Sequence, residues 1–171
     1  MAKLEIEIAE LIRKYHAETG KLLSIGTTES ATGGKIADRI TNVPGSSDYF
    51  KGSLVAYNNE VKTNVLRVRK ETIEDYGAVS SQTALEMAQG GRRLLDVDIC
   101  ISDTGIAGPT GATPEKPVGL FYIGLASWDE ALSQKYLLTG SREENKSYAA
   151  EAALKLLKQY LLRCSNKSSP L

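Results

Sequence analysis

The chain has 171 residues, enough for one domain with its own core and too few for two ordinary domains joined by a linker. Lysine and arginine total 21, as do aspartate and glutamate, so the formal net charge is zero and no basic field is available to hold nucleic acid. The N-terminus carries charges where a signal peptide needs an apolar stretch, and no run approaches the ~18 apolar residues of a membrane span. These features predict a soluble cytoplasmic protein that binds neither nucleic acid nor membranes.

Helical and strand-like patterns alternate through the first half of the chain. Apolar residues at helical spacing predict an amphipathic helix that ends at Gly20, where a left-handed residue is favoured. Glycine, proline and asparagine then mark the boundaries of shorter segments. The predicted elements are a helix over 3–19, a strand over 21–28, a helix from Gly34 that Pro44 ends, a strand over 53–57 and a helix opening at 58–60.

The second half continues this alternation up to a closing strand pair. Gly90 and Gly91 lie inside one predicted helix, where each costs about 1 kcal/mol unless a neighbour packs closely, and we expect that neighbour to be the sheet. The last two strands are predicted to be antiparallel. The predicted elements are helices over 72–76 and from Ser80 or Ser81, strands over 97–103, 119–127 and 131–138, a long helix capped by Ser141, and a flexible tail over 165–171.

Strands separated by helices predict an α/β fold. Its form is a three-layer α/β/α sandwich around a mixed, mostly parallel sheet with one antiparallel strand near an edge, in a single domain over residues 1–164. Ligands bind beyond the carboxyl ends of the strands in such sheets. We therefore expect the loop over 28–35, the region after Tyr57 and the loop over 104–118 to converge on one site.

The most informative of these loops runs from Thr104 to Gly119 between two apolar strands. Its glycines, including Gly105 and Gly108, allow backbone N–H groups to approach a ligand closely. Loops longer than about 12 residues inside compact domains are more often functional than idle. The alternative interpretation is a mobile surface loop.

The histidine and cysteine content limits the chemistry. The single histidine, His16, lies on a charged helix, so the sequence offers neither a histidine metal cluster nor a Ser-His-Asp triad. Cys100 and Cys164 lack the spacing of a zinc site or a redox pair. We expect no metal and no cofactor, and a catalytic base must come from lysine, tyrosine or a carboxylate.

Three segments offer groups that can react. Ser30 lies between a strand and a helix, Ser47 follows a second helix, and Tyr57 and Lys62 stand at a strand end and one helical turn later. Each has a structural alternative: a helix cap for Ser30 or Thr32, a turn for Ser47 and a surface position for Lys62. For Lys62 to act as a base, burial or a nearby cation must lower its pKa by about 3 units.

Five segments together resemble the C-terminal domain of CinA over nearly the whole chain, a family that includes stand-alone nicotinamide mononucleotide amidohydrolases. The resembling segments are 28–34, 44–47, 57–62, 77–80 and 104–119. The resemblance implies a deamidase that converts nicotinamide mononucleotide to nicotinic acid mononucleotide and ammonia in NAD recycling. It also implies an α/β/α sandwich, a small-molecule nucleotide substrate and a homo-oligomer.

The resemblance further implies a catalytic serine and lysine that work without metal. Lys62 matches the lysine, Tyr57 the tyrosine beside it and Thr104 the hydroxyl that opens the glycine loop. Ser30 is the preferred nucleophile and Ser47 its rival. The residues expected to bind substrate or stabilise an oxyanion are Glu29, Thr32, Gly33, Gly34, Gly105, Gly108, Lys116 and Arg142.

The sequence departs from the family pattern at two positions. Ala31 stands where a cysteine is usual, and Ala112 where a glycine is common, and neither change removes a proposed proton carrier. The molybdopterin-binding-like domain that precedes this one in full-length CinA is not expected here, nor its pyrophosphatase activity. Two alternatives stay open: a non-catalytic module that binds a pyridine nucleotide or phosphate ligand, and a hydrolase for another carboxamide or a phosphoester.

Overall fold

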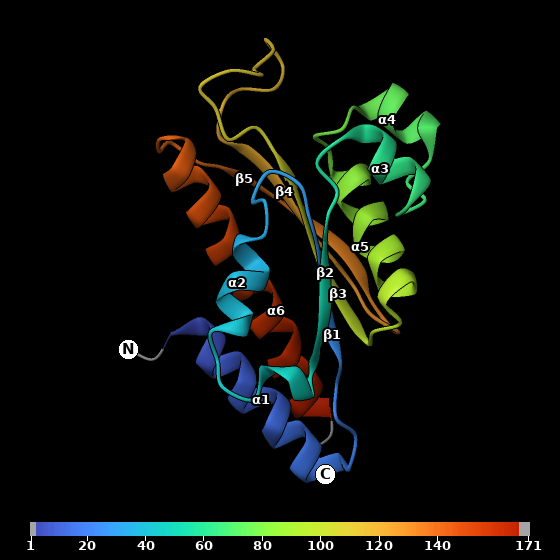
Figure 1. Ribbon diagram of the computed structural model, residues 1–171, viewed down its shortest axis with the longest axis vertical. Coiled ribbons are helices and arrows are strands. Elements are labelled where there is room, and N and C mark those ends of the chain that lie inside the picture. The colour runs from blue at the N-terminus through green and yellow to red at the C-terminus, as the bar shows by residue number, and fades with distance from the viewer. Residues whose placement is uncertain (1–2, 168–171) are drawn as a thin grey trace.

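The computed structural model describes residues 3–167, in which a sheet of five strands is flanked by helices (Figure 1). The strands are β1 (Ile25–Glu29), β2 (Phe50–Val55), β3 (Ile99–Gly105), β4 (Leu120–Ala126) and β5 (Ala131–Leu137). The helices are α1 (Leu4–Thr19), α2 (Lys35–Thr41), the 3-10 turn η1 (Ser46–Asp48), α3 (Asn59–Asn64), α4 (Lys70–Tyr76), α5 (Ser81–Leu95) and α6 (Arg142–Lys167).

The sheet is mixed, in the order β2-β1-β3-β4-β5. β1 pairs in parallel with β2 and β3, whereas β4 pairs antiparallel with both β3 and β5. One strand, β4, therefore runs against the other four and lies second from the edge. This arrangement confirms the predicted mostly parallel sheet with an antiparallel strand near one edge.

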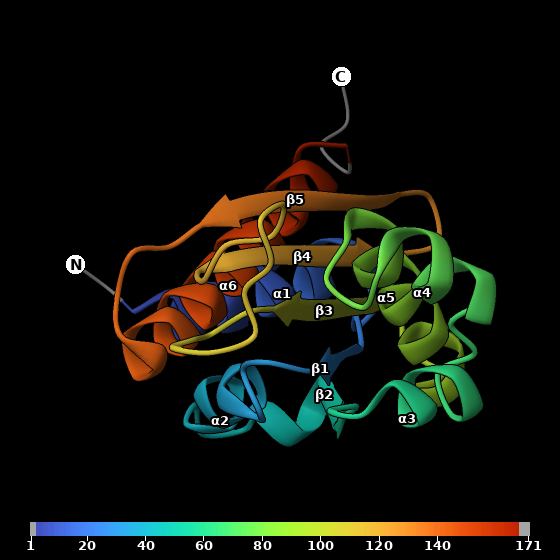
Figure 2. The same ribbon diagram turned by 90° about the horizontal axis from the view of Figure 1, so that it is seen from above.

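Helices cover both faces of the sheet, which confirms the three-layer sandwich. α1, α2 and α6 lie on one face, and α5 with α3 and α4 lies on the other (Figures 1 and 2). The larger apolar cluster lies on the α1 and α6 side and includes Ile12, Ile101 and Leu157, each at most 1% exposed. A smaller cluster around Leu66 and Met87 lies under α3 and α4. The two clusters fix the helices against the sheet and so fix the loops at its carboxyl edge.

The paired glycines of α5 both pack closely, but only Gly91 does so against the sheet as expected, because Gly90 meets the backbone of Leu66 after α3. A Cβ built at Gly90 would lie 1.9 Å from Leu66 O, and one built at Gly91 would lie 2.2 Å from Thr28 Cγ2 on β1. Such distances are far inside van der Waals contact, so only glycine fits at either position. The helix thus approaches the sheet closely behind the strand that leads to Ser30.

Several predicted boundaries were wrong by a few residues. β1 begins at Ile25 rather than at 21, and β2 ends at Val55, which leaves Tyr57 in the loop after the strand. Residues 165–167 were predicted to belong to a flexible tail, but α6 continues through them. Cys164 and Ser165 face the interior there, and each is 7% exposed. The remainder of the predicted tail, 168–171, lies outside the described residues.

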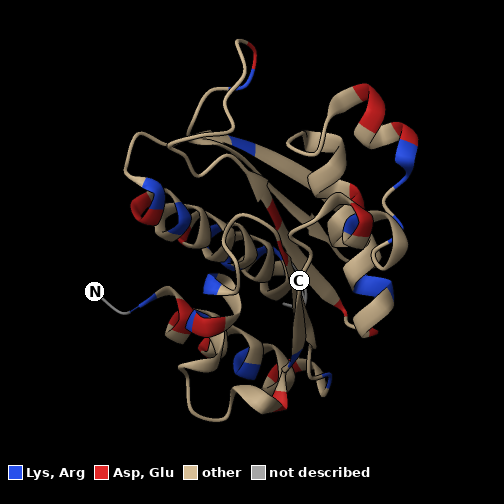
Figure 3. Cartoon of the chain, turned by 45° about the horizontal axis from the view of Figure 1, so that its top comes forward, with Lys and Arg blue, Asp and Glu red and all other residues tan. Residues whose placement is uncertain are grey.

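Charged residues gather on the helices and loops, and the strands carry few of them (Figure 3). Both acidic and basic residues occur on the helices, in a chain whose formal charge is zero. Among the described helices, none has the length and apolar composition needed to cross a membrane.

Candidate active site

The three loops predicted to converge do meet at the carboxyl ends of β1, β2 and β3. They enclose a cavity of ≈230 Å³ together with the start of α6. Its lining residues are Ser30, Ala31, Tyr57, Asn59, Lys62, Ala78, Val79, Thr104, Gly105, Ile106, Ala107, Thr110, Gly111 and Arg142. The cavity therefore lies where ligands bind in open α/β sheets, and it contains both a hydroxyl and an amine that can react.

Lys62 lies inside this cavity wall, next to Ser30. Its Nζ is 3.0 Å from Ser30 Oγ, 2.9 Å from the Ala56 carbonyl oxygen and 3.3 Å from the Tyr57 carbonyl oxygen. The side chain is only 2% exposed, and this burial lowers the pKa of Lys62, although the charge of Asp103 acts in the opposite direction. The structure thus brings the predicted base and the preferred nucleophile together, in the buried setting that a neutral amine requires.

The position of Lys62 follows from the short helix α3. Asn58 caps this helix, since its side chain accepts a hydrogen bond of 2.7 Å from the Glu60 N–H. Lys62 comes one turn later, so its side chain returns under the carbonyl groups that end the preceding strand region. The cap and the returning lysine together close one side of the cavity.

The turn that presents Ser30 is held by hydrogen bonds from below. The Ser30 N–H donates to Asp103 Oδ1 at 3.0 Å, and the Thr32 N–H donates to Asp103 Oδ2 at 3.2 Å. Gly33 and Gly34 have φ angles of 63° and 102°, a region that glycine enters readily. The chain therefore reverses sharply after β1 and leaves the Ser30 hydroxyl facing Lys62.

The N–H groups of this turn are not all free to bind a ligand. The Gly33 N–H donates to the Ser30 carbonyl, and the Gly34 N–H donates to Glu29 Oε2, which differs from the expectation that both would serve substrate. The Ala31 N–H, by contrast, has no acceptor among residues 3–167, and Ala31 is one of the residues that line the cavity. A backbone donor directly after the serine is well placed to stabilise an oxyanion.

Glu29 does not line the cavity, contrary to the prediction that it binds substrate. Its side chain has no exposed surface and accepts N–H groups of Gly34, Ile36 and Ala37 at 2.8, 3.1 and 2.8 Å. These are the unsatisfied donors at the start of α2, which a carboxylate stabilises. Thr32 is also fully buried and contacts Glu29 and Asp103 rather than the cavity.

Arg142 spans the opening of the cavity from the first turn of α6. Its guanidinium donates to the Gly108 carbonyl at 2.7 Å and to Tyr57 Oη at 3.0 Å. Tyr57 is 61% exposed, so both groups can reorient when a ligand enters. Thr104 is 1% exposed and donates to the Ala78 carbonyl at 2.7 Å, which fixes the start of the glycine loop beside Gly105.

Ser47 and Lys116 lie away from this cavity. Ser47 belongs to η1, which precedes β2, and is therefore at the amino edge of the parallel strands, opposite Lys62. Lys116 donates to the Tyr76 carbonyl and ties the long loop to the end of α4. The structure does not support Ser47 as the rival nucleophile, nor Lys116 as a residue of the substrate pocket.

Three residues near the site were not predicted from the sequence. Asp103 is fully buried beneath the Ser30 turn, and burial, opposed by Thr32 and Ser30 and aided by Glu29, raises its pKa to about 6. Asn145 is also fully buried and donates to the Ala107 carbonyl at 3.1 Å, and Asn59 lines the cavity. The available signal for Asp103 was a carboxylate at the end of a predicted strand, directly before the glycine loop.

A second cavity of ≈360 Å³ adjoins the first, since Arg142 lines both. Lys35, Glu143 and Lys146 complete its lining. A Cβ built at Gly33 would lie 3.5 Å from Lys146 Nζ, so this amine reaches over the Ser30 turn. No ion pair joins Lys35 or Lys146 to a carboxylate within residues 3–167. The second cavity therefore suits an anion.

Metal chemistry has no evident donor set in the described part of the chain. No group of three or more histidine, cysteine, aspartate or glutamate side chains there is arranged to hold an ion. Both cysteines are buried and neither forms a disulfide, and burial raises the pKa of Cys100 to about 12.

Comparison with known proteins identifies the family. The chain is 45% identical to a CinA-like protein of Sulfurihydrogenibium sp. (strain YO3AOP1) over 94% of its own length and 40% of that relative. It is 53% identical to a putative competence-damage inducible protein of Halothermothrix orenii, covering 84% of this chain and 36% of the relative. The chain thus spans about two fifths of the length of these curated relatives.

Solved structures agree with this assignment. The competence/damage inducible protein CihA from Agrobacterium tumefaciens is 36% identical, with a TM-score of 0.80 over 88% of this chain and 93% of the other. A CinA superfamily protein from Klebsiella pneumoniae is 27% identical, with a TM-score of 0.84 over 95% and 99% of the two chains. The family model for the CinA C-terminal domain matches residues 5–161, and the chain belongs to this family.

Proposed function

We propose that this chain is an amidohydrolase that converts nicotinamide mononucleotide to nicotinic acid mononucleotide and ammonia. The observation that carries the proposal is the 3.0 Å contact between Lys62 Nζ and Ser30 Oγ in a buried pocket. A serine beside a neutral lysine is an activated nucleophile that needs neither histidine nor metal. Membership of the CinA C-terminal domain family supports the same reaction class.

The first half of the reaction uses the groups around Ser30. The neutral Lys62 amine accepts the Ser30 hydroxyl proton while Oγ attacks the carboxamide carbon. The resulting oxyanion is stabilised by the Ala31 N–H, a type of donor that typically contributes about 3 kcal/mol. The Lys62 ammonium then gives its proton to the amide nitrogen, the carbon–nitrogen bond breaks, and ammonia leaves as the acyl-enzyme forms on Ser30.

The second half restores the serine. A water molecule attacks the ester carbon, Lys62 takes one of its protons, and the carbon–Oγ bond breaks as Ser30 regains a proton. The products are the free carboxylic acid and the original Ser30 hydroxyl. Over the two halves, one carboxamide and one water molecule are converted to one carboxylic acid and one ammonia.

The two adjoining cavities fit the two ends of a mononucleotide. The pocket at Ser30 takes the pyridine ring and its carboxamide, since Thr104 and Ala107 line it beside the nucleophile. The cavity at Lys35 and Lys146 takes the phosphate, with three cationic side chains against one carboxylate in its lining. Arg142 lines both cavities and is placed to meet the ribose or phosphate.

An ammonia-release assay with nicotinamide mononucleotide and no added metal tests the proposal. Wild-type protein is expected to release ammonia, and Ser30→Ala and Lys62→Met are each expected to abolish it. Ser47→Ala is the matched serine control, because Ser47 is exposed at the opposite edge of the sheet, and it is expected to keep full activity. Full activity in Lys62→Met would exclude the mechanism.

The same assay separates the alternatives. Tight binding of the mononucleotide without ammonia would identify a binding module rather than an enzyme. Release of inorganic phosphate instead of ammonia would identify a phosphoester hydrolase. Ammonia from other carboxamides at a higher kcat/KM would retain the chemistry and change the substrate.

A further inference from the structure

Two buried carboxyl groups meet at a single hydroxyl beneath the Ser30 turn. Glu29 and Asp103 both have no exposed surface. Thr32 Oγ1 lies 2.6 Å from Glu29 Oε2 and also contacts Asp103 Oδ1. A threonine hydroxyl carries one hydrogen, so it can donate to only one of these two oxygens.

The other contact needs a hydrogen from one of the carboxyl groups. If both were ionised, one anionic oxygen would face a lone pair of Thr32 where water cannot reach, which is unfavourable. A proton on Asp103 removes the conflict. Asp103 Oδ1–H then donates to Thr32 Oγ1, and the Thr32 hydroxyl donates to Glu29.

Asp103 is the better of the two carboxyl groups to carry this proton. Glu29 accepts three N–H groups at the start of α2 and a Thr27 hydroxyl at 3.2 Å, so four donors already point at its two oxygens. Asp103 accepts only two N–H groups, from Ser30 and Thr32. Consistent with this difference, burial and the nearby Glu29 raise the pKa of Asp103 to about 6.

The proton on Asp103 affects Lys62. The charged groups that act on Asp103 are Glu29 from β1 and Lys62 from α3. The residue paired with Asp103 on the neighbouring strand β4 is the apolar Ile123. An ionised Asp103 favours the ammonium form of Lys62. A protonated Asp103 with a neutral Lys62 holds as many protons as an ionised Asp103 with an ammonium. The neutral amine can therefore form without net loss of a proton to solvent.

We propose that Asp103 is a positioning residue that, through Thr32 and Glu29, retains a proton whenever the Lys62 amine is neutral, and so keeps that amine available beside Ser30. The inference rests on the proposed function for what the amine does. The protonation of Asp103 is nevertheless a property of the free protein, and it can be measured without substrate.

Infrared titration of the free 171-residue chain between pH 5 and pH 8 tests the proposal. A carboxylic-acid C=O band that shifts on [¹³C]aspartate labelling is expected, with a midpoint near pH 6. Asp103→Asn should remove the band, whereas Asp98→Asn, before the same strand, should leave it unchanged. Lys62→Met removes the cation that favours ionised Asp103. The titration midpoint of the Asp103 band should therefore be higher in this variant than in the wild type, by about one pH unit or more.

Two results would overturn the proposal. One is the lack of any aspartate carboxylic-acid band over this range in both the wild type and Lys62→Met. The other is a band whose midpoint is the same in both proteins. The isotope label assigns the band to aspartate even if Asp103→Asn does not fold. Since no substrate is present, either result would leave ammonia release by Ser30 and Lys62 untouched, and the two failures are distinguishable.

Discussion

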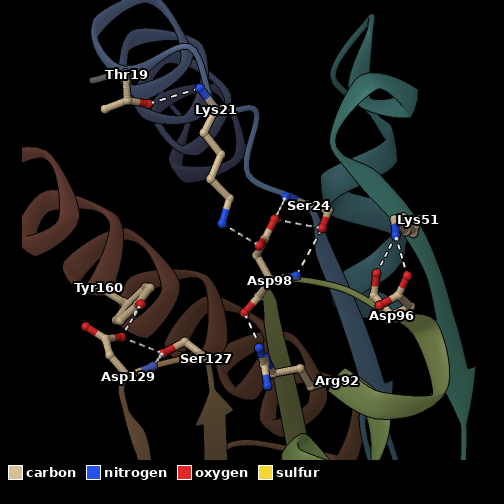
Figure 4. A network of polar contacts seen from close by, with 10 residues as sticks. All are labelled: Thr19, Lys21, Ser24, Lys51, Arg92, Asp96, Asp98, Ser127, Asp129 and Tyr160. Carbon is tan, nitrogen blue, oxygen red and sulfur yellow. Dashed lines mark hydrogen bonds and ion pairs between the residues drawn. The ribbon is translucent and has the colours of Figure 1, made fainter.

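The two ends of β3 place the same residue type in opposite electrostatic settings. Asp98, just before the strand, accepts hydrogen bonds of 2.8 and 3.0 Å from the Ser24 N–H and hydroxyl and lies 2.9 Å from Lys21 Nζ (Figure 4). Asp103, near the other end, is fully buried, and within residues 3–167 its side chain is hydrogen-bonded only to Ser30 and Thr32. One aspartate has a cation at its side chain, whereas the other lies under a reactive turn.

The pKa shifts of the two aspartates differ in sign. Burial alone would raise the pKa of Asp98, but the Ser24 hydrogen bonds and the Lys21 ammonium outweigh it and the net pKa is lowered. For Asp103 burial prevails and the pKa rises to about 6, while burial lowers the pKa of nearby Lys62. Groups held away from their ordinary protonation state are typical of functional sites. This contrast supports the chemistry proposed at the carboxyl edge of the sheet and assigns the amino edge a structural role.

The largest expected effect comes from removing a reacting group at the carboxyl edge. Ser30→Ala or Lys62→Met should lower kcat for ammonia release by at least about 10³-fold, because each removes a group that acts in the transition state. Asp98→Asn at the amino edge should keep kcat within about two-fold at a temperature where it is folded, since it only weakens an ion pair. A comparable loss of kcat in Asp98→Asn would contradict the division between the edges.

The next effect is on stability at the carboxyl edge. The folded pKa of Asp103 lies above its unfolded value of 3.8, so its contribution to stability is complete below about pH 4 and is lost as pH rises through about 6. The shift of roughly two units corresponds to about 3 kcal/mol. Asp103→Asn should remove this decline, as measured by urea unfolding from pH 4 to pH 8. An unchanged pH dependence in the variant would show that Asp103 does not titrate in this range.

The contribution of Asp98 to the free energy of unfolding should change with pH in the opposite direction and by a smaller amount. Its folded pKa is lowered, so its contribution is present above the unfolded pKa and is lost as pH falls through the folded pKa. Asp98→Asn should therefore destabilise the protein by about 1–2 kcal/mol at pH 7 and by less at pH 3. Urea unfolding at the two pH values measures the difference. Equal destabilisation at both would point to lost hydrogen-bond geometry rather than lost charge.

The contrast between the edges also explains what could be predicted from the sequence. Periodicity and glycine positions predicted the helices, the strands and the convergence of three loops, because each depends on local pattern and on the rule for parallel strands. The close packing at Gly90 and Gly91 was predictable since glycine inside a helix needs a reason. Strand ends were less accurate, because strand pairing rather than local sequence sets where a strand begins.

The candidate site was only partly predictable for a physical reason. The Ser30 and Lys62 pair follows from the family resemblance, but its 3.0 Å contact depends on the approach of α3 to β1. The sequence suggests that Glu29 binds a ligand, but its carboxylate accepts hydrogen bonds from the N–H groups at the start of α2 instead. Asp103 reads as a strand residue, and its role depends on burial beneath a turn 73 positions away. Such contacts between distant segments have no local pattern.

The smallest predicted effect concerns the cationic cavity beside the site. Lys146→Ala should raise the KM for nicotinamide mononucleotide by about five-fold with little change in kcat, because a partly exposed ammonium contributes on the order of 1 kcal/mol to phosphate binding. Inhibition by nicotinamide riboside, which lacks the phosphate, should be unchanged. Lys116→Ala is the matched control, since Lys116 contacts the Tyr76 carbonyl outside both cavities. If Lys146→Ala weakened binding of the nucleotide and of the riboside equally, Lys146 would not contact the phosphate. The proposed chemistry at Ser30 would be unaffected by that result.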